Sequence, residues 1–234
     1  GIGGLGGPLA GVELAIPSGK GFECPDPEAF LAPPSHDPLF DRLVRSAPKF
    51  GLNKDALQEF VGLYKLMPVI LPNLLRQITI TDMHVGGNLG ALVRCYLKDA
   101  DKNEKDQIRD LLVDNLRSEH PLAVIIIGLL RSVPPSSAIT LELGNRLKDH
   151  DNCGVRTGAI LLLRHLKEIT EPAEKLARQA LKDSCWQVQS AALSFLAAIE
   201  ENRKATVSRE IYDELPSPLL LRAVIEEGDN ITED

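Results

Sequence analysis

Five histidines are the side chains in this sequence best suited to acid–base or metal chemistry: His36, His84, His120, His150 and His165. Two of them stand at spacings found among metal ligands, in Asp82-x-His84 and His150-x-x-Cys153. A structural zinc site needs four ligands, and neither pair has a second pair nearby in the sequence. We therefore expect no metal ion, no cofactor and no catalytic residue, and a protein that is not an enzyme.

Two glycine-containing segments near the start have the letters of nucleotide-binding motifs. The segment GIGGLG at residues 1–6 matches GxGxxG, and Gly19-Lys20 matches the end of a phosphate-binding loop. A dinucleotide fingerprint needs a strand before it and a helix after it. Eight glycines among the first 21 residues and six prolines by position 34 indicate neither element. We interpret residues 1–34 as a flexible or extended arm, or alternatively as a segment that docks in a groove of the fold through its scattered apolar residues.

The cysteines indicate the compartment. Cys24, Cys95, Cys153 and Cys185 are far apart in the sequence and form no CxxC pair. This pattern predicts reduced thiols in an intracellular, cytoplasmic protein. No apolar run reaches the length of about 18 residues that a membrane-spanning helix requires, so we expect no contact with a membrane.

The charge of the chain narrows the class of partner. The formal net charge is −7, and residues 201–234 alone hold nine acidic and four basic side chains. Nucleic-acid binding needs a basic contact face, so the acidic balance disfavours it. Aromatic residues make up 4% of the chain, so the core is expected to consist mainly of Leu, Ile, Val and Ala.

A repeat of 33 residues organises the chain from Ala56 to Ala197. Written under one another, the segments that start at Ala56, Leu89, Leu122, Val155 and Val188 share three apolar columns. The columns are Phe60, Val93, Ile126, Ala159, Ala192; then Leu63, Tyr96, Leu129, Leu162, Phe195; then Tyr64, Leu97, Leu130, Leu163, Leu196. Spacings of three and four place them on one helix face, and a fixed period of this size is typical of a solenoid.

Each repeat is predicted to be a pair of helices. After a helix that starts at Pro38, capped by Asp37, the first helices are expected at 69–80, 103–117, 136–148, 171–182 and 202–215. The second helices are expected at 54–67, 87–98, 121–132, 153–168, 186–199 and 218–227. The predicted N-caps are Asn53, Asn103, Ser136, Thr170, Ser184 and Ser217, with Ser184 and Gln187 forming a capping box.

Two copies of the repeat resemble a known family. LKDHDNCGVRTGAILLLRHL from Leu147 and LKDSCWQVQSAALSFLAAI from Leu181 are similar to HEAT repeats of the short, PBS-lyase-like type. The resemblance implies an all-α, right-handed α-solenoid of five to six helical hairpins over residues 35–228, followed by an acidic tail at 229–234. It also implies that Asp149, Asp183 and Arg156 stand where an Asp and an Arg link neighbouring repeats.

The function expected of such an array is binding without catalysis. We expect a scaffold or adaptor that holds another protein or a peptide on the concave face. The alternative is a nucleic-acid-binding or DNA-repair module, such as the HEAT-like glycosylases, although Trp186, the only Trp, is better explained by packing between repeats.

A column of basic residues ends four of the rows and is the predicted partner-binding surface: Lys65, Lys98, Arg131 and Arg164. An aligned row of cations would attract an acidic or phosphorylated segment. The alternative is that each cation only stabilises the C-terminus of its own helix.

Overall fold

The computed structural model describes residues 23–29, 35–46 and 53–200, and all regular structure in these ranges is helical. They contain ten α-helices, two short 3-10 helices and no strand, which confirms the all-α prediction. They divide into two compact units at the junction between Val133 and Pro134. We call these the N-terminal unit and the C-terminal unit and describe each by itself.

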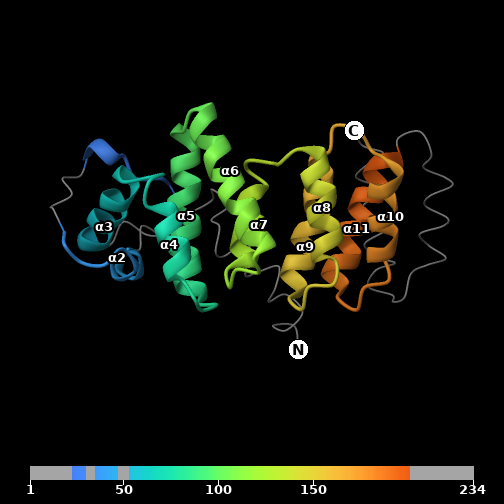
Figure 1. Cartoon of the computed structure of the whole chain (residues 1–234), viewed down its shortest axis with the longest axis horizontal. Helices are drawn as coiled ribbons and strands as arrows, with labels where there is room; N and C mark the ends of the chain where they lie inside the picture. The colour runs from blue at the N-terminus through green and yellow to red at the C-terminus, as the bar shows by residue number, and fades with distance from the viewer. Residues whose placement is uncertain (1–22, 30–34, 47–52, 201–234) are drawn as a thin grey trace. The chain divides into compact units, whose positions relative to one another are not determined.

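The described part of the N-terminal unit contains one 3-10 helix and six α-helices (Figure 1). These are η1 (Pro27–Ala29), α2 (Leu39–Arg45), α3 (Lys54–Lys65), α4 (Leu71–Gln77), α5 (Met83–Asp99), α6 (Lys102–Arg117) and α7 (Ala123–Leu130). Helix α5 is central, because α2, α3 and α7 all pack against it, and α6 packs against α7. None of the described helices of either unit is both long enough and apolar enough to cross a membrane.

The described part of the C-terminal unit consists of two helical hairpins. The first joins α8 (Ser137–Leu147) to α9 (Cys153–Leu162), which continues into the 3-10 helix η3 (Leu163–His165). The second joins α10 (Glu171–Ala180) to α11 (Trp186–Ile199). Helices α9 and α11 pack against each other, and α8 meets α10 beside them (Figure 1). The two hairpins therefore form two layers, with α9 and α11 in one and α8 and α10 in the other.

Most of the helix ends lie within a few residues of their predicted positions, and side chains explain where several helices begin. Asn53 and Ser136 accept hydrogen bonds from backbone N–H groups of the first turn, as predicted. Asp82 and Asn152 do the same for α5 and α9. Thr170 stands at the N-cap of α10 but makes no such bond. The predicted helices at 202–215 and 218–227, with Ser217, lie outside the described residues.

Three of the predicted caps are wrong. Asp101, not Asn103, caps α6, because Asp101 and Glu104 form a reciprocal capping box that a helix beginning at 103 would leave unused. Cys185, not Ser184, precedes α11, so the capping box of Ser184 with Gln187 does not form. Asp37 pairs with Arg45 at 2.7 Å instead of capping α2, whose N-cap is Pro38.

The three apolar columns of the repeat form the core of both units. Every member of the columns except Tyr64 is buried, and most have 1% exposure or less. Tyr64 remains half-buried because its hydroxyl donates a 2.7 Å hydrogen bond to the exposed Asp99, while its ring meets the edge of Tyr96. The repeat pattern therefore identifies the core correctly, with one polar exception.

All four cysteines are paired, so the prediction of reduced thiols is wrong. Cys24 is joined to Cys95 of α5, and Cys153 of α9 is joined to Cys185 before α11. The pairs are 71 and 32 residues apart in sequence, so only the packing of the helices brings them together. The first disulfide also attaches part of the predicted arm to α5; residues 1–22 and 30–34 of that arm lie outside the described residues.

Candidate functional site

An ion pair between Arg156 and Asp183 links the two hairpins of the C-terminal unit. Arg156, on α9, donates from Nε and Nη2 to the two carboxylate oxygens of Asp183, at 2.9 and 3.0 Å. Asp183 lies in the turn between α10 and α11, and the two side chains are 15% and 13% exposed. A two-pronged bond of this kind fixes direction as well as distance. The linkage that the HEAT resemblance implies is therefore present at this junction.

Further hydrogen bonds hold this ion pair in place. The backbone N–H of Cys185 donates to the Asp183 carboxylate at 2.8 Å, and the Gln189 side-chain amide donates to the Asp183 carbonyl at 2.7 Å. On the other side, Nη1 of Arg156 donates to the carbonyl of His150 at 2.7 Å. The pair thus connects the turn before α9 to the turn before α11, which makes it a structural joint between repeats.

Next to this joint the surface is hollowed along the junction of α8 and α10. Two adjoining cavities of about 390 and 350 Å³ share Lys148, Leu176 and Gln179 in their walls. We call the combined depression the α8–α10 groove. Its apolar side chains are Ile160, Pro172, Leu176, Ala180 and Val188. Gly144 allows the helices to approach, since a Cβ atom there would lie 2.9 Å from Cδ1 of Leu176.

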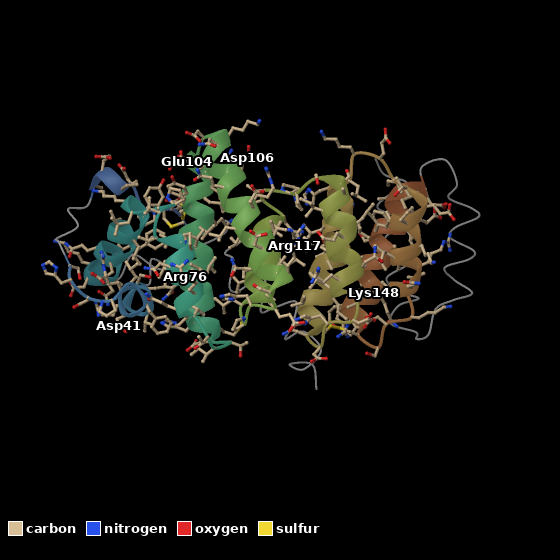
Figure 2. All side chains as sticks on the ribbon, in the orientation of Figure 1. Asp41, Arg76, Glu104, Asp106, Arg117 and Lys148 are labelled. Atoms are coloured by element: carbon tan, nitrogen blue, oxygen red, sulfur yellow. A yellow bond between two sulfur atoms is a disulfide. The ribbon has the colours of Figure 1, made fainter. Side chains whose placement is uncertain are left out.

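The polar rim of the α8–α10 groove is richer in lysine than in carboxylate. Its exposed charged residues, apart from the Arg156–Asp183 pair, are Lys148, Lys175, Lys182, Asp149 and Glu171. Three cations therefore face two carboxylates in a chain whose net charge is −7. Lys148, labelled in Figure 2, borders both cavities. Amides of Asn145 and Gln179 add groups that can both donate and accept hydrogen bonds.

A short motif shared by the two hairpins of the C-terminal unit is the sequence signal for this groove. The tripeptide Leu-Lys-Asp occurs at 97–99, at the end of α5, and twice in the C-terminal unit, at 147–149 and 181–183, where α8 and α10 end. Both lysines and both aspartates line one cavity. Equivalent turns of consecutive hairpins lie side by side when hairpins stack, which is why two identical tripeptides meet here.

The predicted partner-binding cations all lie at the C-terminal ends of second helices and are exposed. Lys65 ends α3, Lys98 is the penultimate residue of α5 and Arg131 follows α7, all in the N-terminal unit. Arg164 lies in η3 of the C-terminal unit, and its Nη1 donates to Ser194 of α11 at 2.6 Å. These positions suit stabilisation of the helix dipoles. A single row of all four as a binding surface stays a prediction.

The residues at the two metal-like spacings have structural roles. Asp82 accepts from the N–H groups of His84 and Val85, so its carboxylate caps α5. Nδ1 of His150 accepts from the N–H of Asn152 at 3.0 Å, and Cys153 is in a disulfide. Within residues 23–29, 35–46 and 53–200, no three His, Cys, Asp or Glu side chains lie close enough to hold a metal ion.

His120 and Trp186 differ in how far they are covered by the fold. His120 is buried; its Nδ1 accepts from Leu122 N–H, so Nε2 carries the proton and donates to the Leu75 carbonyl at 2.7 Å. Trp186 is 37% exposed, so packing between the repeats covers only part of its surface.

Comparison of the chain with protein-family models, with curated proteins and with solved structures finds no match.

Proposed function

We propose that this chain is a non-enzymatic scaffold of HEAT-like hairpins, arranged as a right-handed α-solenoid, that binds an acidic segment of another protein. The observation that carries this proposal is the α8–α10 groove, which combines an apolar floor with a lysine-rich rim. An extended peptide can bury apolar side chains on such a floor while its carboxylates or phosphates face the lysines.

The chemistry of the groove favours a peptide over a small molecule. The two cavities adjoin through a shared wall formed by Lys148, Leu176 and Gln179, so one ligand can occupy both. Amide side chains along the rim can pair with the N–H and C=O groups of an extended backbone. Small-molecule sites are more enclosed and more apolar, with few charged groups.

The proposal is tested by titrating a fluorescein-labelled glutamate-rich peptide, with and without phosphoserine, and following its anisotropy. The change Lys148→Glu with Lys182→Glu replaces two attractive contacts by repulsive ones, so we expect affinity to fall by at least about tenfold. Unchanged affinity in this variant would exclude the α8–α10 groove as the binding surface.

A control variant carries the same change of charge elsewhere. Lys102 and Lys167 are exposed and lie outside both cavities, so Lys102→Glu with Lys167→Glu should bind the peptide nearly as the natural chain does. A third variant, Arg131→Glu with Arg164→Glu, tests the predicted basic row. If only this third variant loses binding, the partner occupies the helix C-termini and not the groove.

The same titration with labelled single-stranded and double-stranded DNA distinguishes the other class of partner. Binding of DNA tighter than of the acidic peptide, with an affinity that falls steeply as salt is added, would replace the scaffold proposal with a nucleic-acid-binding module.

A further inference from the structure

The disulfide between Cys153 and Cys185 spans the junction of the two hairpins in the C-terminal unit. Cys153 is the first residue of α9, and Cys185 is the residue immediately before α11. Their Cα atoms are 6.3 Å apart, and both residues are half-buried. The covalent bond therefore joins the N-terminal ends of α9 and α11, the two helices of this unit that pack against each other.

Gln187 lies directly against this disulfide and is only 2% exposed. Its Oε1 is 2.8 Å from Sγ of Cys185 and 3.8 Å from Sγ of Cys153, while its Nε2 has no hydrogen-bond partner. A disulfide sulfur carries no hydrogen and cannot donate to Oε1. Turning the amide over would direct Nε2 to the sulfur, a weak acceptor, and would leave Oε1 at the position without a partner. In the disulfide form, the buried amide thus has no hydrogen-bond partner in the orientation present, and when turned over it has only a weak sulfur acceptor for Nε2 and no donor for Oε1.

The dithiol form removes part of this deficit. The sulfur of Cys185 is already 2.8 Å from Oε1 in the disulfide form, and the thiol formed when the S–S bond opens has a proton to donate to that oxygen. Leaving a buried polar group without a partner is costly, so a partner that exists only after reduction stabilises the reduced form. An apolar side chain at position 187 would remove this preference.

We propose that the Cys153–Cys185 disulfide is a redox-responsive staple across the α9–α11 junction, and that Gln187 stabilises its opened form. Opening proceeds by exchange with a dithiol. A thiolate of the dithiol attacks one sulfur, which forms a mixed disulfide and releases the other cysteine as a thiolate. The second thiol of the reagent then closes its own disulfide and releases the remaining cysteine. Two electrons and two protons pass to Cys153 and Cys185, and the dithiol is oxidised.

The neighbouring ion pair determines what opening the staple does. The N–H of Cys185 is bonded to the carboxylate of Asp183, which in turn holds Arg156 of α9. These non-covalent bonds connect the same two helix ends as the disulfide, so the hairpins stay associated after reduction. The expected change is a looser first turn of α11 and not separation of the helices.

The test measures the equilibrium between thiol and disulfide in the full chain with mixtures of oxidised and reduced dithiothreitol. Free thiols are trapped by alkylation, and the chain is digested with trypsin and analysed by mass spectrometry. Each of the four cysteines falls in a separate tryptic peptide, because Lys or Arg residues separate them. The variants are Gln187→Met, which keeps a similar shape without an amide, and Gln187→Leu.

Both variants should need about a three- to tenfold higher ratio of reduced to oxidised reagent to open half of the Cys153–Cys185 bonds. The Cys24–Cys95 disulfide, in the other unit, is the internal control and should open at the same ratio as in the natural chain. Equal ratios for variant and natural chain, or an equal shift of both disulfides, would refute the role of Gln187. If Gln187→Leu fails to fold, as judged by circular dichroism, the ratio measured for Gln187→Met alone tests the role of Gln187.

A second measurement needs no variant. Amide hydrogen exchange of the natural chain, with and without the dithiol, should become faster at residues 183–189 when the staple opens, while α10 keeps its protection. Unchanged exchange at residues 183–189, or complete alkylation of Cys153 and Cys185 before any reductant is added, would show that the bond is not a staple.

Discussion

At the scale of single residues, the Arg156–Asp183 pair is the contact whose loss should be most costly. Arg156→Ala leaves the Asp183 carboxylate mostly enclosed, with 13% of the side chain exposed, and removes the guanidinium that pairs with it. We expect the free energy of unfolding to fall by about 2–4 kcal/mol, measured by urea denaturation.

The matched control for this change is Arg146→Ala in the same unit. Arg146 and Glu142 form an exposed pair at 3.9 Å, with side chains 49% and 39% exposed. Exposed pairs contribute about 0–1 kcal/mol, so this variant should unfold almost as the natural chain does. Equal losses for Arg146→Ala and Arg156→Ala would mean that the pair is not a joint between the hairpins.

Tyr64 gives the residue-scale prediction for pH. Desolvation by burial, together with the hydrogen bond to Asp99, raises the pKa of the Tyr64 phenol above its ordinary value of 10.0. Because the folded state holds the phenol proton more tightly than the unfolded state does, this contribution is complete below pH 10.0 and is lost as the pH rises further. Tyr64→Phe should therefore show a smaller decline in stability above that pH, in urea melts compared across the alkaline range. A parallel decline in both proteins would contradict the assignment.

At the scale of the helices, the N-terminus of α6 is where the cap predicted from the sequence differs from the cap in the structure, and mutation can distinguish the two. Asp101→Ala removes one half of the capping box with Glu104 and should cost about 0.5–2 kcal/mol. Asn103→Ala, two residues later and already inside the helix, should cost nothing or stabilise slightly, because Ala is the better helix former. Urea melting of both variants measures the difference; a larger loss for Asn103→Ala would mean that Asn103 is the cap.

At the scale of the whole molecule, we predict which of the two units a substitution in the core destabilises. Leu163 has 0% exposure in the core shared by the two C-terminal hairpins. Leu163→Ala leaves a cavity there, so we expect a loss of about 2–5 kcal/mol. Because the change lies within the C-terminal unit, we expect that unit to unfold at lower urea than the N-terminal unit. Hydrogen exchange read separately for the two units measures this separation.

The control for Leu163→Ala is Leu66→Ala. Leu66 is 43% exposed, so its truncation should leave the urea midpoint nearly unchanged. An unchanged midpoint in Leu163→Ala as well would show that the third apolar column does not form the core.

The sequence by itself determined the helices and the core. Helices depend on near neighbours, and apolar residues three and four apart specify a buried face whatever lies beyond it. That is why the spacing of apolar residues is enough to identify the columns of the repeat, from Phe60 to Leu196, along with most of the helix ends. The link between Arg156 and Asp183 was expected for another reason, the resemblance to HEAT repeats, which implies an Arg and an Asp at these positions.

Only the tertiary structure decided the contacts between residues far apart in the chain. Which cysteines pair depends on where α5, α9 and α11 place them, and the spacing of the four cysteines carries no such information. The half-exposed position of Tyr64 depends on Asp99, which is 35 residues away. The α8–α10 groove arises because two Leu-Lys-Asp turns meet, and a hollow depends on how closely side chains of neighbouring helices fill the space between them.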